Sequence, residues 1–197
     1  MKKYNRVAFV HIPKTGGRTI LHTLDEKHKL GLKLPNYPSK TESIHFTYDE
    51  YKKENYDIFF SCIRIPHDWL QSFYYYTGFD IRTRRKRLEE VRKHKTFEKF
   101  ILEEGYMVLK ERFGLLTQSE WVKQIPIENL LRTNFLQHDF DQFTNKYNLT
   151  NVRLITTGVN KRVRDKRINN ETMSKIQEVF AEDYKLFEKV SEFRTIK

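Results

Sequence analysis

The sequence is poor in cysteine, glycine and proline. Cys62 is its only cysteine, which excludes both a disulfide within the chain and a zinc site built from several cysteines. Seven glycines and five prolines exclude collagen-like and Gly/Pro-rich low-complexity sequence. A lone cysteine is typical of a reducing compartment, so we expect a cytoplasmic location.

Long apolar runs are absent as well. No stretch approaches the ~18–20 apolar residues that a membrane helix needs. The apolar stretch that follows the basic N-terminus ends at His11, and it is too short for the core of a secretory signal. We therefore expect no membrane segment and no signal peptide.

Aromatic and charged residues are abundant. Phenylalanine occurs 15 times and tyrosine 11 times, which argues against disorder although 32% of residues are charged and the mean hydropathy is −0.74. The length of 197 residues suits one domain of about 100–200 residues. With no repeat or long linker in the chain, we expect residues 1–197 to form a single domain.

The chain is strongly basic. Its formal net charge is +11, which implies an anionic partner but does not say whether that partner is nucleic acid, a membrane, a glycan or a phosphorylated small molecule. Most of the excess lies in two segments, residues 80–95 with a net charge of +5 and residues 161–167 with +4. The positions of these two basic segments in the fold therefore bear on which anionic partner the chain binds.

Two short apolar runs, Val7–Val10 and Ile58–Ile63, are typical of buried parallel strands. Alternation of such strands with helices predicts an α/β fold, with a mainly parallel central sheet flanked by helices. Ligands of these folds bind at the carboxyl ends of the strands. The remaining predicted elements are helices over residues 19–28, 48–54, 67–76, 82–95 and 135–147, a long C-terminal helix capped by Asn170, and weaker strands over 129–132 and 152–156.

The segment after the first strand reads HIPKTGGRT, from His11 to Thr19. Adjacent glycines let the backbone curl and expose successive N–H groups, and the following helix adds its positive dipole end, so the segment predicts an anion site. Lys14 can add a point charge. A nucleotide kinase would carry the lysine after the glycines in G-x-x-x-x-G-K-[ST], and this order is reversed here.

This segment resembles the 5′-phosphosulfate loop of sulfotransferases that use 3′-phosphoadenosine 5′-phosphosulfate (PAPS). Its sequence from His11 to Gly17 is similar to that of the carbohydrate branch, which includes heparan sulfate 2-O-sulfotransferase. The resemblance implies a P-loop-like sandwich, PAPS as cofactor and 3′-phosphoadenosine 5′-phosphate (PAP) as product. Arg18 stands where the family often has threonine. The implied cofactor ligands are Lys14, Thr15, Gly16, Gly17, Arg18 and Thr19.

The segment after the second strand supports this resemblance. In the family, an arginine at the strand end and a serine eight residues later hold the 3′-phosphate, and Arg64 and Ser72 have that spacing. Arg64 can make a bidentate, charge-assisted contact with a phosphate. Looser similarities cover Thr117–Trp121, Asn134–Phe140 and Thr157–Lys161. The last of these is similar to a loop that closes over the nucleotide, so Lys161 and Arg162 are further candidate ligands.

Sulfuryl transfer needs positioning and charge stabilisation more than covalent chemistry, as in phosphoryl transfer. We assign Lys14 to the charge that develops on the leaving phosphate. The acceptor needs a general base, for which His45 is the first candidate and His11 the second. His67 and the acids Asp49 and Glu50 are weaker candidates. No metal is expected.

Two other functions stay open. A kinase using ATP and Mg²⁺ shares the fold type, and a nucleic-acid-binding protein could use the basic segment 82–95 beside the aromatic run Tyr74–Tyr76. No nucleic-acid recognition motif is present, so we expect no nucleic-acid partner. The expected acceptor is a carbohydrate or a small metabolite, and an anionic acceptor would explain segment 82–95. Acceptor identity, O- or N-sulfation and oligomeric state stay open.

Overall fold

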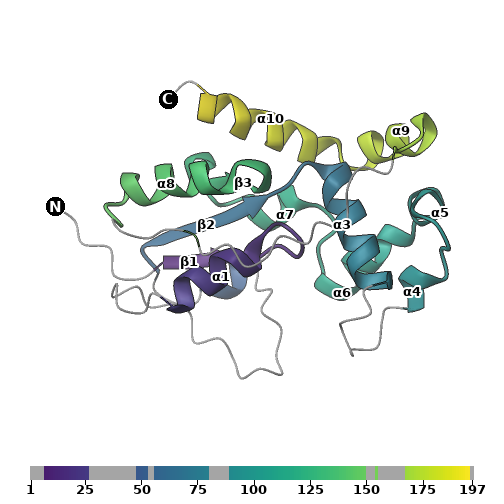
Figure 1. Cartoon of the computed structure of the whole chain (residues 1–197), viewed down its shortest axis with the longest axis horizontal. Helices are drawn as coiled ribbons and strands as arrows, with labels where there is room; N and C mark the ends of the chain where they lie inside the picture. Colours follow the sequence, from purple (N-terminus) through teal and green to yellow (C-terminus); the bar gives the residue numbers. More distant parts are fainter. Residues whose placement is uncertain are drawn as a thin grey trace. The chain divides into compact units, whose positions relative to one another are not determined.

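The computed structural model describes residues 7–26, 48–52, 56–79, 89–149, 154 and 167–195 (Figure 1). These residues form a mixed α/β structure with an open three-stranded parallel sheet and many helices. The chain divides into two compact units. The sheet unit comprises Met1–Arg64, Trp121–Val159 and Phe187–Lys197, and the helical unit comprises Ile65–Glu120 and Asn160–Leu186.

The sheet contains β1 (Val7–Val10), β2 (Ile58–Ile63) and β3 (Leu130–Arg132), in the order β1-β2-β3 (Figure 1). Both strand pairs are parallel, and Val10 lies opposite Ser61 in the register. The bounds predicted for the first two strands are confirmed, and the third begins one residue later than predicted. The three strands therefore deliver the segments that follow them to one edge of the sheet.

One face of the sheet carries the apolar core of the sheet unit. Two helices, α1 (Gly17–Glu26) and α8 (Leu136–Lys146), supply apolar side chains to the same cluster as the strands. Burial of a large apolar side chain contributes about 1.5–3 kcal/mol, so this cluster is a main source of stability. Its buried members are Val7, Phe9, Ile20, Leu24, Ile58, Phe60, Cys62, Leu131, Phe140, Phe143 and Leu154.

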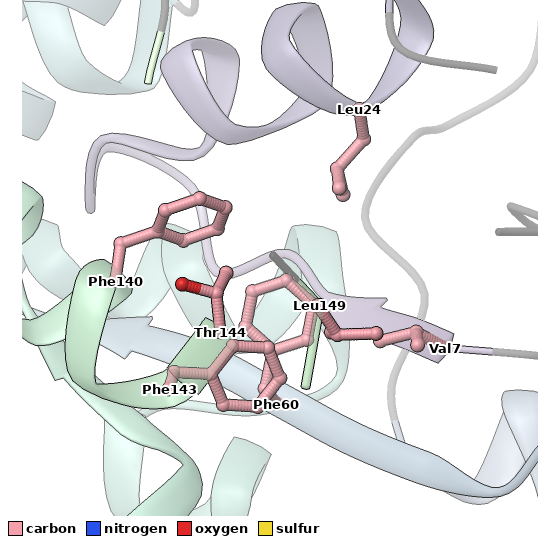
Figure 2. A pocket seen from close by; sticks show the side chains of 7 residues that line it. All are labelled: Val7, Leu24, Phe60, Phe140, Phe143, Thr144 and Leu149. Atoms are coloured by element: carbon pink, nitrogen blue, oxygen red, sulfur yellow. The ribbon is translucent and has the colours of Figure 1, made fainter. Parts of the chain in front are cut away.

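A small cavity lies inside this core (Figure 2). Leu24 reaches it from α1, and Phe140 and Phe143 reach it from α8 (Figure 2). The other lining residues are Val7, Phe60, Thr144 and Leu149. The cavity is apolar and holds no more than a water-sized molecule, so it does not fit an anionic ligand.

Short elements complete the sheet unit. Helix α2 (Tyr48–Tyr51) places the Tyr48 ring 4.6 Å from the Phe59 ring of β2. The turn η3 (Ile127–Asn129) leads into β3, and Asn129 Nδ2 donates to Phe59 O at 2.9 Å. The turn η4 (Thr133–Phe135) then leads from β3 into α8.

Arg194 joins several of these elements. It lies near the end of α10 (Ala181–Thr195), in the part of that helix that belongs to the sheet unit. Its guanidinium donates to Leu130 O at 2.9 Å, to Glu128 O at 3.1 Å and to Gln142 Oε1 at 2.8 Å. Arg194 therefore supplies donors to the carbonyls at the start of β3.

The helical unit is built around aromatic side chains. Trp69 and Tyr106 both meet the fully buried ring of Phe180 edge-on, with centroids 6.1 and 5.6 Å away. None of the helices in the described ranges combines the length and the apolar character needed to cross a membrane. The helical unit includes α3 (Pro66–Phe79), α4 (Glu89–Arg92), α5 (Phe97–Leu102), η2 (Gly105–Met107), α6 (Val108–Phe113) and α9 (Asn170–Val179). Helix α7 (Gln118–Val122) begins in this unit.

The predicted C-terminal helix is wrong in two respects. The residue that caps it is Asn169, whose side chain accepts from Thr172 N at 2.8 Å, rather than Asn170. The helix also ends at Val179, and α10 begins after Phe180. Of the other predicted elements, residues 82–88 and the strand at 152–156, apart from Leu154, lie outside the described residues.

Candidate functional site

The loop between β1 and α1 contains two residues in the left-handed conformation. Lys14 has a φ of 68° and Gly16 has a φ of 89°. Glycine adopts this conformation freely, whereas a lysine is strained there by roughly 1–2 kcal/mol. Such strain persists only where the surrounding structure holds it in place. The loop is therefore a built feature of the fold and not a flexible connection.

Hydrogen bonds inside the loop turn two of its carbonyls toward its own donors. The buried Thr15 hydroxyl donates to Ile12 O at 2.9 Å. The backbone N–H of Thr19 donates to Gly16 O at 3.0 Å and closes the first turn of α1. Neither carbonyl is left to face a ligand.

Two further loop carbonyls are met by residues that follow the other strands. Thr133, directly after β3, donates its hydroxyl to Thr15 O at 2.8 Å. Arg64, directly after β2, brings Nη1 to 3.5 Å from Lys14 O, which is a longer and weaker contact. All three strand exits therefore meet at the loop.

The amide groups at the start of α1 complete the arrangement. The first N–H groups of any helix have no acceptor within the helix. For Gly16, Gly17 and Arg18, the described residues provide no backbone acceptor either. These N–H groups, together with the positive end of the helix dipole, are suited to an anion such as a phosphate or sulfate.

His11 explains why the second of the two glycines is needed. A Cβ atom at Gly17 would overlap the Cδ2 and Nε2 atoms of the His11 ring. This ring is buried and stacks on Phe9, with centroids 5.5 Å apart. His11, our second candidate for the general base, therefore packs against the loop from within the fold.

The two residues predicted to hold the 3′-phosphate belong to different units. Arg64 is half-buried in the sheet unit and contacts the loop. Ser72 is buried within α3 of the helical unit, at 8% exposure. Their shared role stays a prediction.

The weaker candidate bases His67 and Asp49, and Trp121 at the end of the similar segment Thr117–Trp121, lie in different surroundings. His67, in the helical unit, is hydrogen-bonded through Nδ1 to the Tyr184 hydroxyl at 2.9 Å. Burial is the main reason that the pKa of Tyr184 rises to about 12, so this hydroxyl keeps its proton. Asp49 is exposed and accepts from Gln124 Nε2 at 3.1 Å. Trp121 is 2% exposed and belongs to the core.

Several predicted site residues lie outside the described residues. They include the first candidate base, His45, and the two candidate nucleotide ligands, Lys161 and Arg162. Of the basic segment 82–95, only residues 89–95 are described, and Glu89–Arg92 form α4. Within the described ranges, no cluster of three or more His, Cys, Asp or Glu side chains could hold a metal ion.

Thr133 was not among the predicted site residues. The similarity to a family element begins at the next residue, with the segment Asn134–Phe140. The available signal was position: Thr133 directly follows a predicted strand that ends at Arg132, at the edge where ligands bind in such sheets. A hydroxyl there was a candidate for the site.

No family model matches the chain, and no curated protein matches it. The case for a function therefore depends on the loop itself. Its geometry combines inward-facing carbonyls, amides at a helix start, and the basic residues Lys14 and Arg64.

Proposed function

We propose that the chain is a sulfotransferase that uses PAPS as its sulfuryl donor. The observation that carries this proposal is the direction of the loop carbonyls. Those of Ile12, Lys14, Thr15 and Gly16 all accept from donors of the protein. An anion at the loop therefore meets amide N–H groups and is not repelled by carbonyl oxygens.

The chemistry of the available donors fits PAPS, which carries negative charge at both its 5′ and 3′ ends. Lys14, the amides of residues 16–18 and the Thr19 hydroxyl would hold the 5′-phosphosulfate. Arg64 would hold the 3′-phosphate, and the family resemblance adds Ser72, Lys161 and Arg162. A P-loop-like sandwich is the fold that this proposal implies.

Bound PAPS supplies a sulfuryl group on a phosphosulfate anhydride, and the chain's own residues supply positioning and charge. The amides at the start of α1 are fixed before the ligand arrives, so they do not reorganise during transfer. The Lys14 ammonium stabilises negative charge as it grows on the leaving phosphate. Together they favour in-line transfer to a hydroxyl or amine.

The acceptor must lose a proton, and we assign this step to His45. A histidine is neutral near pH 7 and can accept a proton at its free ring nitrogen. His45→Ala should lower turnover strongly while nucleotide binding persists. Unchanged turnover in this variant would remove His45 from the mechanism. The proposed acceptor is a carbohydrate hydroxyl or a small metabolite, which mass spectrometry of an acceptor panel incubated with PAPS can identify.

A thermal-shift titration tests the proposed function. PAP without magnesium should stabilise the protein, by about 2.7 kcal/mol at a hundred times the dissociation constant. Lys14→Ala and Arg64→Ala should reduce this stabilisation, and Arg64→Ala should weaken PAP binding more than binding of the analogue with a 3′-hydroxyl. Lys123, an exposed lysine of the sheet unit, provides the matched control Lys123→Ala.

Three results would contradict the proposal. Stabilisation by Mg·ATP alone would indicate a kinase. Steeply salt-dependent binding of random oligonucleotides, without any response to PAP, would indicate a nucleic-acid-binding protein. An equal loss of PAP binding in Lys123→Ala and Lys14→Ala would show that the effect is general electrostatics.

A further inference from the structure

Thr133 contacts both of the segments that the proposed function assigns to binding PAPS. Its hydroxyl oxygen lies 2.8 Å from Thr15 O in the loop after β1. The same oxygen lies 2.9 Å from Ile63 O, at the end of β2 and directly before Arg64. One half-buried side chain therefore joins the exits of two strands.

These contacts constrain the loop in a specific way. A hydroxyl has one hydrogen to donate, and here two carbonyl oxygens lie within reach of it. Bonding to Thr15 O keeps this carbonyl turned toward Thr133, directly after β3. Bonding to Ile63 O fixes the backbone immediately before Arg64.

The aliphatic part of Thr133 also limits the loop. A Cβ atom at Gly16 would lie 3.6 Å from Thr133 Cγ2 and 3.3 Å from Leu136 Cδ2. The loop therefore passes close to Leu136, at the start of α8, and to the Thr133 methyl group, so there is little room for a side chain at Gly16.

We propose that Thr133 is a positioning residue that fixes the distance between the loop and Arg64, and so favours a ligand with two separated anionic groups. This inference rests on the proposed function, since it concerns the same donor site. Thr133 itself need not touch PAPS, because it acts through its hydrogen bonds to the carbonyls of Thr15 and Ile63. Without its hydroxyl, the two groups would no longer be held at one separation.

Two substitutions separate the hydroxyl from the shape. Thr133→Val keeps the volume and removes the donor, whereas Thr133→Ser keeps the donor. Ser61→Ala is the matched control: the Ser61 hydroxyl donates to Val10 O at 2.6 Å and also joins β1 to β2, but within the sheet. All three variants change one hydroxyl or one methyl group in the same unit.

The readout is the ratio of dissociation constants for PAP and for adenosine 5′-phosphate, measured by calorimetry. Thr133→Val should weaken PAP binding by roughly tenfold and reduce the preference for PAP. Thr133→Ser should stay near the wild type. Ser61→Ala should lower the melting temperature and leave the ratio unchanged. Hydrogen exchange without ligand should show faster exchange of the amides of residues 15–19 in Thr133→Val only.

Each contrary outcome has a distinct meaning. If the wild type binds PAP and Thr133→Val keeps both the ratio and the exchange rates, the positioning role is wrong while the proposed function stands. If Ser61→Ala changes the ratio as much as Thr133→Val does, the effect is general loss of stability and the role is again wrong. If the wild type does not bind PAP, the proposed function fails and the selectivity assigned to Thr133 fails with it.

Discussion

The imidazole of His11 occupies the space in which a side chain at residue 17 would begin. Glycine is thus required at this position by close approach of a ring, while Gly16 is required by its positive φ of 89°. Two adjacent glycines that look equivalent in the sequence have different physical reasons. The two reasons can be separated by experiment.

Gly17→Ala should destabilise the protein, because the new methyl group must displace the His11 ring. We expect a cost of about 1–3 kcal/mol, as for overpacking at other buried sites. In the His11→Ala background the same change should cost much less. Urea unfolding of the four proteins in this double-mutant cycle measures the coupling.

The control for this prediction is Gly114→Ala. Gly114 has a φ of 74°, and a Cβ atom there would meet nothing within 4 Å. Its substitution should cost about 1–2 kcal/mol from conformation alone, whether or not His11 is present. If the cost of Gly17→Ala is also independent of His11, the overlap is not what excludes a side chain.

Lys14→Gly should stabilise the protein and abolish transfer. The change relieves a left-handed φ of 68°, with an expected gain of about 1 kcal/mol, and it removes the charge assigned to the leaving phosphate. Lys14→Ala should lose transfer without the gain. Denaturant unfolding and a transfer assay measure the two effects.

Glu104→Gly is the matched substitution elsewhere. Glu104 has a φ of 57° and lies in the helical unit on the surface. The Glu104→Gly protein should gain similar stability and keep full activity. A Lys14→Gly protein that retains transfer would remove Lys14 from the mechanism.

Acid should weaken the sheet unit through Asp139. Burial alone raises the pKa of this carboxyl, but hydrogen bonds from the Arg132 side chain and backbone outweigh burial, so its pKa lies below the ordinary value of 3.8. The Arg132 guanidinium is bidentate, with both contacts at 2.9 Å. The ionised form therefore stabilises the fold above the unfolded pKa, and this contribution is lost as pH falls through the lower folded pKa.

Asp139→Asn tests this assignment against Asp141→Asn on the same helix. Removing one partner of a buried pair costs about 3–5 kcal/mol, whereas Asp141 is exposed and bonded only to Gln137 among the described side chains. Stability curves between pH 7 and pH 2 should show a shallower acid decline for Asp139→Asn than for wild type or Asp141→Asn. Identical slopes for all three proteins would place the acid sensitivity elsewhere.

Cys62 should resist alkylation in the native protein. It is fully buried, and burial, followed by the nearby charge of Asp139, raises the pKa of its thiol. The reactive thiolate is therefore scarce in the folded state. Iodoacetamide should label Cys62 slowly without denaturant and rapidly in urea, as measured by mass spectrometry of the intact protein. Rapid labelling of the native protein would mean that β2 is open to solvent.

Local patterns were enough to predict the strands and most helix positions. The runs at β1 and β2 are apolar at nearly every residue, and such runs are recognisable without knowledge of their neighbours. The loop after β1 was likewise identifiable, because its lysine and glycines follow a strand directly. The left-handed conformation of Lys14 could not be predicted in this way. It occurs in a loop whose carbonyls contact Arg64 and Thr133, which lie far away in the sequence.

Tertiary contacts account for the features that were missed. No glycine or proline marks the break at Phe180, so no local signal predicts it. The buried Phe180 ring instead meets Trp69 and Tyr106 edge-on, contacts that become visible only in the folded structure. Asn169 and Asn170 are equally good caps by residue type, and only backbone conformation distinguishes them. Thr133 acts across long separations in the chain, where no spacing rule applies.

Arg194 has a consequence for the order in which the protein can fold as it is synthesised. The ribosome makes β1 and β2 early, but β3 comes after most of the helical unit, and Arg194 comes after all three strands. Its donors to Leu130 O and Glu128 O are thus among the last parts of the sheet unit to be translated. A nascent chain that stalls before residue 194 lacks the donors for Glu128 O and Leu130 O, so cotranslational folding can complete the helical unit before it completes the contacts at the start of β3.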